Sequence, residues 1–413
     1  MNRKILKDEH IKQRLELLEH ECRQILEENI LKFWLDNMQD DENGGFYGQM
    51  LGDGTVVKTA NKGGILNARL LWTFSSAYRI TRNRIYLNAA KRCKDYIIDH
   101  FLDKEYGGTY WELDYKGNPV DTKKQFYAIG FMIYGLSEYY RATGEQDALQ
   151  HALDLFRCIE EYSYDSVNDG YIEACTREWG EISDMRLSEK DENYPKSQNT
   201  HLHIIEPYAN LYRVCKCPPV EKALENLINI FKDKILNPDT HHLDLFFSMD
   251  WKRMGLLESY GHDIECSWLL HEAALVLGNK TVLKQVEPVV KLVAKASEKG
   301  LQSDGSMCYE ADLATGYFCE ERHWWVQAET VVGFFNLYEQ FGDEQALQKS
   351  LSCFEYIKSH LIDYERGEWW GISNADGTIK KGEDKAGFWK CPYHNGRMCM
   401  ELIERISRMN NDK

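Results

Sequence analysis

Two histidines stand where helices are expected to begin, and both could exchange protons near neutral pH. His262 lies three residues before Glu265, and His394 follows closely after Pro392. Because the partial positive charge of a helix N-terminus disfavours imidazolium, each histidine is expected to be neutral and able to act as a base. Glu265 shares a helical face with His262 and could fix its tautomer. A buried or capping histidine without a chemical role is the alternative reading for each.

Other polar and aromatic residues interrupt helix-length segments that are mostly apolar. Arg69 lies inside the apolar run Ile65–Trp72, which favours an inward guanidinium that faces an anion or a developing oxyanion. Asn199 and His203 share a helical face, as do His203 and Glu206. Tryptophan is usually a core residue, but its flat ring also suits the apolar face of a sugar. The further candidates in these segments are Tyr127, Trp268, Trp324, Trp325, Glu329 and Trp389.

A sequence repeat relates the segments that carry these candidates. A glycine next to aromatic residues recurs with gaps of 63, 62, 135 and 62 residues, at Gly45, Gly108, Gly170, Gly305 and Gly367. The longest gap is two periods plus about ten residues, so a degenerate copy is expected near His242–Phe246. Six units of this period account for most of the chain, and each holds two helix-length segments.

The two segments of a unit differ in their pattern. Lys222–Leu236 has one apolar stripe and a charged face, whereas Gln125–Tyr140 is apolar on most sides. Helices of the first kind lie at a surface and those of the second kind are buried. We therefore predict an (α/α)6 barrel, a toroid of six inner and six outer helices with short hairpin-like loops, as one catalytic domain over residues 1–413. An open solenoid is the alternative, although its common helical repeats are shorter, at about 34–47 residues.

In such a barrel the inner helices are parallel, so their starts meet at one mouth and the candidates converge on one pocket. Composition limits what that pocket binds. The 413 residues include 50 Lys and Arg against 66 Asp and Glu, a net charge of −16, which argues against a nucleic-acid partner. The sequence also shows no phosphate-binding glycine loop and no Gly-x-Ser-x-Gly motif.

The chain is expected to be cytoplasmic. Its longest uncharged, mostly apolar stretch, Gln125–Ser137, is too short for a membrane span, and its first ten residues hold no apolar signal segment. Twelve scattered cysteines are typical of reduced intracellular thiols. The pairs Cys215/Cys217 and Cys391/Cys399 do not have zinc-site spacing, so no metal is predicted. Monomer and homodimer are both compatible with the composition.

Four segments resemble the cellobiose 2-epimerases of the N-acylglucosamine 2-epimerase superfamily. They are Asp41–Gly48, Tyr260–Trp268, Trp324–Glu329 and Trp389–Arg397, and the resemblance runs from about residue 10 to residue 408. The fold of that family is an (α/α)6 barrel. The resemblance implies reversible epimerisation at C2 of the reducing-end sugar of β-1,4-linked disaccharides, without a cofactor. Cellobiose would become glucosyl-mannose, and lactose would become epilactose.

The resemblance also implies roles for individual residues. His262 and His394 match the acid/base pair, which would remove and return the C2 proton on opposite faces of an enediolate. Arg69, Glu265, Trp268, Trp325 and Glu329 match residues needed for activity, with Arg69 stabilising charge on oxygen. Tyr127, Asn199, His203 and Trp389 match substrate-contacting positions, and His203 could assist ring opening. The context of Tyr127 departs from the histidine-containing version of the family.

Alternatives within the same fold are a mannobiose 2-epimerase, an N-acylglucosamine 2-epimerase and an aldose–ketose isomerase. A glycoside hydrolase of this fold needs two carboxylates flanking a sugar, and Glu265 with Glu329 could be assigned that way. A non-catalytic scaffold or lectin is the third class, but it has no need of histidines at matched helix starts.

Overall fold

Helices dominate the computed structural model of the protein, which describes residues 9–411. Residues 1–8, which make up most of the N-terminal segment considered above, lie outside the described residues. The α-helices are α1 (Glu9–Gln24), α2 (Lys32–Asn37), α3 (Gly64–Thr81), α4 (Arg84–Tyr96), α5 (Phe126–Thr143), α6 (Gln146–Tyr162), α7 (Gln198–Cys215), α8 (Pro218–Ile230), α9 (Tyr260–Leu277), α10 (Lys280–Ser297), α11 (Trp324–Phe341), α12 (Glu344–Tyr356) and α13 (Tyr393–Asn411). A π-helical turn, Ile25–Leu31, joins α1 to α2, and the similar turns Ile97–Phe101, Phe231–Ile235 and Ile357–Leu361 end three outer helices.

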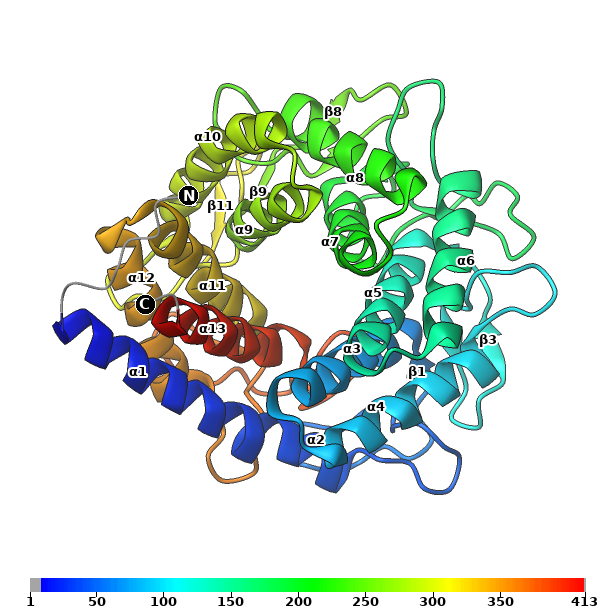
Figure 1. The fold of residues 1–413 in the computed structure, drawn as a ribbon, viewed down its shortest axis with the longest axis horizontal. Coiled ribbons are helices and arrows are strands. Elements are labelled where there is room, and N and C mark those ends of the chain that lie inside the picture. Colours follow the sequence, from blue (N-terminus) through cyan, green and yellow to red (C-terminus); the bar gives the residue numbers. More distant parts are fainter. Residues whose placement is uncertain (1–8, 412–413) are drawn as a thin grey trace.

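The inner helices form a closed ring (Figure 1). Each of α3, α5, α7, α9, α11 and α13 contacts the next, and α13 returns to contact α3. The outer helices α4, α6, α8, α10 and α12 pack on the inner helices that precede them, and α1 packs on α13. Because an open solenoid would leave two unpaired ends, this closure confirms the predicted (α/α)6 barrel.

Burial follows the two sequence patterns. Every residue of α5 from Phe126 to Tyr139 is buried, whereas α10 buries one stripe that includes Val282, Val286 and Val293. A helix that is apolar on most sides needs neighbours on most sides, which only the inner ring provides.

Two-residue loops connect each of the first five inner helices to the outer helix that follows it. The first loop residue adopts the left-handed conformation, as Gly278 does at φ +78. The second is the N-cap residue of the outer helix, and at Asn83, Asn279 and Asp343 its side chain accepts backbone N–H groups of the first turn. Such a short connection makes the two helices antiparallel. All the inner helices therefore point the same way, with their N-termini at one face of the barrel.

Short strands fix those N-termini. Five strands each precede an inner helix directly, and each pairs with a strand of the following repeat, which ties neighbouring units together at this face. The strands are β1 (Lys62–Gly63), β2 (Glu112–Leu113), β3 (Pro119–Asp121), β4 (Lys124–Gln125), β5 (Ala174–Cys175), β6 (Lys196–Ser197), β7 (Phe246–Phe247), β8 (Arg253–Met254), β9 (Leu257–Ser259), β10 (Glu310–Asp312), β11 (Tyr317–Cys319), β12 (Arg322–His323) and β13 (Ile372–Ser373). The sheet orders are β1-β2-β3, β4-β5, β6-β7-β8, β9-β10-β11 and β12-β13.

A buried ion pair anchors the glycine turn in most repeats. Lys62 Nζ donates to Asp40 Oδ2 at 2.7 Å and to the carbonyl of Gly44 at 2.7 Å. The same arrangement recurs as Lys124–Asp103, Lys196–Asp165 and Lys385–Asp363. The expected degenerate copy is present as the turn Asn237–His242. The hairpin-like loops of the prediction are thus turns, and three of them, at Asp40, Asp103 and Asp165, are held to the strand directly before an inner helix.

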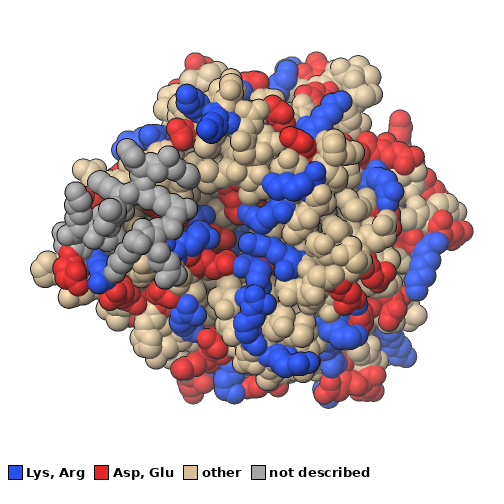
Figure 2. All heavy atoms as spheres, in the orientation of Figure 1, with Lys and Arg blue, Asp and Glu red and all other residues tan. Residues whose placement is uncertain are grey.

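No helix in the described part of the chain is both long enough and apolar enough to cross a membrane. On the face shown in Figure 2, Lys and Arg side chains form a band across the middle, and Asp and Glu side chains lie among and beside them. The net negative charge of the chain is therefore not spread over this face as one continuous acidic surface.

The ion pairs of the turns give a stability prediction. Lys62→Met leaves Asp40 buried without its cation, and breaking a buried pair in this way costs about 3–5 kcal/mol. Lys91→Met, which removes an exposed pair with Asp95, should cost less than about 1 kcal/mol. Equilibrium urea unfolding measures both. A loss for Lys62→Met no larger than that for Lys91→Met would contradict the anchoring role.

Candidate active site

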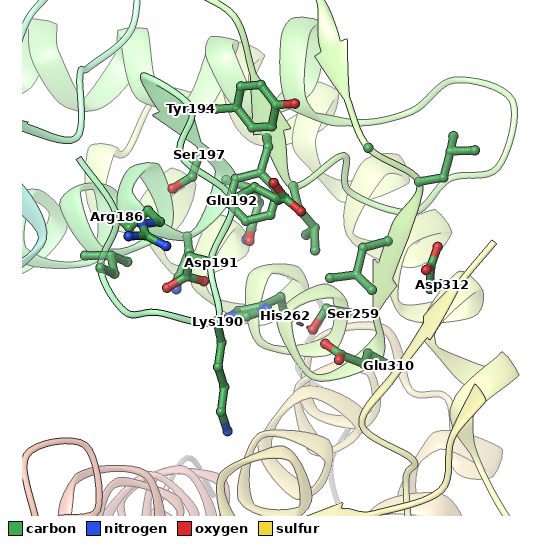
Figure 3. Close-up of a pocket in the computed structure, with 18 of the residues that line it drawn as sticks. Arg186, Lys190, Asp191, Glu192, Tyr194, Ser197, Ser259, His262, Glu310 and Asp312 are labelled. Carbon is green, nitrogen blue, oxygen red and sulfur yellow. Dashed lines mark hydrogen bonds between the residues drawn. The ribbon is translucent and has the colours of Figure 1, made fainter. Parts of the chain in front are cut away.

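The N-termini of the inner helices surround a cavity of about 540 Å³. Its lining includes nine of the residues singled out in the sequence as catalytic or substrate-binding: Arg69, Tyr127, Asn199, His203, His262, Glu265, Trp325, Trp389 and His394. A second cavity of about 500 Å³ adjoins it and shares His262, Asn199 and Tyr309 with its lining. Figure 3 shows this second cavity, where Arg186, Asp191 and Tyr194 of the loop before β6 lie across from Glu310 and Asp312 of β10.

His394, at the start of α13, is held by a carboxylate behind it. Its Nδ1 lies 2.7 Å from Glu329 Oε1, and Trp268 Nε1 donates to Glu329 Oε2 at 2.9 Å. Glu329 and Trp268 are buried and are not among the residues that line the cavity. The structure therefore places these two expected substrate-binding residues behind His394, where the carboxylate makes Nδ1 the protonated nitrogen.

His262 is held differently. Its Nδ1 lies 2.8 Å from Ser259 Oγ, the hydrogen bond drawn in Figure 3. Glu265 was expected to fix the tautomer of His262, but it bonds to Arg397 at 2.6 Å instead. Trp325 lies near both histidines, with ring centroids 4.9 Å from His262 and 5.6 Å from His394. In the described chain no protein group bonds Nε2 of either histidine, so each keeps one ring nitrogen for the cavity.

Burial keeps both histidines neutral. It lowers the pKa of His262 to about 3, with His203 adding to the effect, and lowers the pKa of His394 to about 3 despite the hydrogen bond to Glu329. Glu329 itself stays ionised because Arg397 and His394 outweigh its burial and lower its pKa. A neutral imidazole with a free lone pair can accept a proton, as the sequence analysis expected of both residues.

Arg69 and His203 occupy the side of the cavity formed by α3, α5 and α7. Arg69 is buried, as its apolar context predicted, and donates to the hydroxyl of Tyr127 at 2.9 Å. Its Nε has no protein partner. His203 Nδ1 lies 3.1 Å from Glu206 Oε2, which fits the shared helical face of these two residues. A guanidinium with an unused donor can bind a substrate oxygen.

Aromatic rings wall the cavity next to these groups. Trp389 lies 5.9 Å from Tyr127 between ring centroids, and Trp324 lies 6.4 Å from His394. The Oδ1 atom of Asn199 is buried without a protein partner. Flat apolar walls with a few unsatisfied polar atoms suit a ligand with apolar faces and a hydroxylated edge, such as a sugar.

Sequence reasoning missed part of this site. The carboxyls of Glu206, Glu265 and Glu329 all bond Arg397, a residue of the quoted segment Trp389–Arg397 that carried no assigned role. Its place three residues after His394 on a helix was the available signal. Ser259, and the loop residues Ser188 and Asp191 that line the cavity, gave no such signal because loops are placed by contacts distant in sequence.

Glu265, Glu329 and His394 also bring their ligand atoms within 4.8 Å of one another, as a metal site would. The Arg397 guanidinium lies between the two carboxyls, however, 2.6 Å from one and 2.7 Å from the other. A cation bound there would meet this guanidinium, so the three residues do not fit a metal ion well.

An (α/α)6 barrel whose mouth holds two neutral histidines, an arginine and tryptophan walls has the groups that proton transfer on a small polar substrate requires. Comparison with known proteins identifies the family of this chain. The sequence profile of N-acylglucosamine 2-epimerase (GlcNAc 2-epimerase) matches residues 45–396. A cellobiose 2-epimerase of Bacteroides fragilis is 57% identical over 388 residues, which cover 94% of this chain and 99% of that protein.

A cellobiose 2-epimerase of Ruminococcus albus is 41% identical, covering 93% of this chain and 98% of that protein. The structure of cellobiose 2-epimerase from Bacillus thermoamylovorans superposes with a TM-score of 0.91 at 42% identity, covering 94% of this chain and 100% of that chain. The chain belongs to the N-acylglucosamine 2-epimerase family. It is a carbohydrate epimerase, an isomerase.

The environment of the two histidines predicts their titration. Because the pKa of each is lowered to about 3 by burial, both should remain neutral at pH 5, where a free histidine is protonated. The unfolded chain then binds more protons than the folded chain, so these groups make the free energy of unfolding decrease as the pH falls from about 6.5 toward 3. Nitrogen-15 NMR of histidine-labelled protein, assigned with His262→Asn and His394→Asn, tests this. A midpoint above pH 6 for either ring would refute it.

Proposed function

We propose that the enzyme reversibly epimerises C2 of the reducing-end sugar of β-1,4-linked disaccharides, converting cellobiose to glucosyl-mannose and lactose to epilactose. The observation that carries this proposal is the pair of neutral histidines beside Trp325, each with Nδ1 bonded inside the protein and Nε2 left for the cavity. The 57% identity to a cellobiose 2-epimerase supports the choice of substrate.

The chemistry requires no redox step. Ring opening exposes the aldehyde of the reducing-end sugar, and the C2 proton becomes acidic because the electron pair left by its removal delocalises onto O1 as an enediolate. One neutral histidine takes the C2 proton. The other, which must first take up a proton from solvent, delivers that proton to the opposite face of C2. Inversion then leaves atoms and charges balanced, and solvent exchange restores each histidine for the reverse reaction.

Other residues of the cavity have supporting roles in this proposal. Arg69 stabilises the negative charge that develops on the substrate oxygen, an interaction strengthened in a water-poor pocket. His203, held at Nδ1 by Glu206, assists proton transfer during ring opening. Tyr127, Asn199, Trp325 and Trp389 bind the sugar rings, while Trp268 and Glu329 hold His394 in place.

The alternative of glycoside hydrolysis fits the geometry poorly. Both oxygens of Glu329 are occupied, one by His394 and Arg397 and the other by Trp268, so this carboxylate has no oxygen for a sugar or a water molecule. A hydrolase needs two carboxyl groups that both reach the substrate. Mannobiose 2-epimerase, N-acylglucosamine 2-epimerase and aldose–ketose isomerase use the same proton chemistry and are separated by their products.

We propose that the chain forms one catalytic domain, because every inner helix contributes a residue to the same cavity. We also propose that it acts in the cytoplasm, where twelve cysteines without a disulfide would remain reduced.

Proton NMR of cellobiose incubated with the pure protein in D2O with EDTA tests the function. We expect a growing signal of a mannose-type reducing end, with deuterium at C2 and an unchanged number of sugar units. Released glucose would instead indicate hydrolysis, and a ketose signal would indicate an isomerase. If cellobiose does not change, the same assay on mannobiose and N-acetylglucosamine would show whether the enzyme acts on one of those sugars instead.

The two-histidine mechanism makes a prediction for single variants. His262→Asn and His394→Asn should each slow epimerisation by about 10²–10⁴-fold, because each removes one proton-transfer group. Each variant keeps one histidine, so in D2O it should exchange the C2 proton of one sugar only, without inversion. One variant should exchange the C2 proton of cellobiose, and the other should exchange the C2 proton of glucosyl-mannose. His271→Asn, a change at a buried histidine farther along α9, should leave the rate unchanged. Wild-type turnover in either active-site variant would exclude the mechanism.

A further inference from the structure

Arg397 gathers three carboxyl groups from three inner helices at one guanidinium. Its NH1 donates to Glu206 on α7, and its NH2 donates to Glu265 on α9 at 2.6 Å and to Glu329 on α11 at 2.7 Å. The side chain is fully buried. The guanidinium carbon lies 4.8 Å from the ring centroid of Trp268 and 4.4 Å from that of Tyr393, so aromatic rings also restrain it.

Each of these carboxyls has a separate task at the cavity. Glu206 bonds His203 Nδ1, and Glu329 bonds His394 Nδ1. Glu265 bonds neither histidine within 3.5 Å, and its Oε2 has no protein partner although Glu265 lines the cavity. Two carboxyls therefore face histidines, and the third has an unused oxygen and belongs to a residue that lines the cavity.

We propose that Arg397 is a positioning residue, which holds Glu206 and Glu329 behind His203 and His394 and turns the free oxygen of Glu265 toward the substrate. The inference rests on the proposed epimerisation, and it extends that function to a residue that does not itself line the cavity. A planar guanidinium has two terminal nitrogens that can hold different partners at fixed angles, whereas a lysine ammonium is a single point charge.

The charges of Arg397 and its three carboxyl partners are consistent with separate roles for Glu265 and for the other two carboxyls. Three ionised carboxyls around one guanidinium would leave two uncompensated negative charges in a buried site, which is costly. Burial and the charge of Glu329 raise the pKa of Glu265, whereas Arg397 keeps the pKa of Glu206 and Glu329 low against their burial. Of the three carboxyls, Glu265 is therefore the one whose protonated form is most favoured.

Charged and titratable groups reach this cluster from every inner helix. They are Arg69 on α3, Tyr134 on α5, His203 and Glu206 on α7, Glu265 on α9, Glu329 on α11, and Tyr393 and His394 on α13 itself. Of the two arginines, Arg397 is the one that bonds the carboxyls. Its removal should therefore alter both the geometry of the cluster and the protonation of His394.

Two substitutions separate geometry from charge. Arg397→Lys keeps the positive charge but loses the two terminal nitrogens that hold separate carboxyls. We therefore expect kcat on cellobiose to fall about a hundredfold while KM changes less than threefold. Arg397→Met also removes the charge. Because Arg397 helps to keep His394 neutral, the acidic limb of kcat/KM and the NMR titration midpoint of His394 should then move up by about one pH unit or more.

Arg405 provides the matched control on the same helix. It is 5% exposed and binds Asn336, Glu339 and Glu401, none of which lines the cavity. Arg405→Lys and Arg405→Met should lower the melting temperature but leave kcat and the titration of His394 unchanged. Melting temperatures and circular dichroism are measured for all four variants, so that a loss of folded protein is not read as a loss of catalysis.

Two results would overturn the proposal. One is a folded Arg397→Lys protein with kcat within threefold of wild type, which decides the matter even where Arg397→Met does not fold. The other is a folded Arg397→Met protein whose His394 midpoint is unchanged. The titration of His394 needs no sugar, so it tests the role of Arg397 independently of the substrate. If the wild-type protein does not convert cellobiose, that result counts against the proposed function and not against the role of Arg397.

Discussion

Exclusion of water from the barrel axis is the constraint on which the site depends. A closed ring of mostly apolar inner helices leaves the polar groups at its centre without solvent, so each must find a protein partner or remain unsatisfied at a cost. Glu329 meets this condition by bonding His394, Arg397 and Trp268 together. Buried polar atoms without a protein partner occur in several parts of the described chain, and four of them, Arg69 Nε, Asn199 Oδ1, Glu265 Oε2 and Trp324 Nε1, belong to residues that line the cavity. A ligand in the cavity could satisfy these four.

Burial lowers the pKa of both histidines, but different groups support them. His394 is backed by a carboxylate, which fixes its tautomer and stabilises the imidazolium formed after proton transfer, as in other carboxylate–histidine pairs. His262 is backed by a serine hydroxyl, which can either donate or accept. An enzyme that works in both directions must let each histidine act in turn as base and acid. The unequal supports mean that the two directions need not have equal rates.

The repeated turns explain how helices far apart in sequence deliver side chains to one cavity. A buried lysine pairs with a turn aspartate in four of the repeats, and in three of them, at Lys62, Lys124 and Lys196, the lysine lies in the strand directly before the inner helix. The repeat before α9 departs from the rule. Glu258 stands in place of the lysine and bonds Lys299 at 2.6 Å, while His242 bonds Asp263 at 2.6 Å, directly beside His262. The unit that carries one proposed base therefore has its own anchoring arrangement.

The sequence by itself determined the six-unit period, the alternation of surface and buried helices, and the position of His262 and His394 at helix starts, because these depend on local spacing and on apolar pattern. It also determined that Arg69 faces inward, since a charge within a buried helix has few other places to lie. Only the tertiary structure decided which partner each side chain has. Glu265 bonds Arg397 and not His262, and Trp268 and Glu329 lie behind the cavity wall. Such pairings join residues far apart in the chain, such as Glu206 and Arg397 at 191 positions, and no local pattern encodes them.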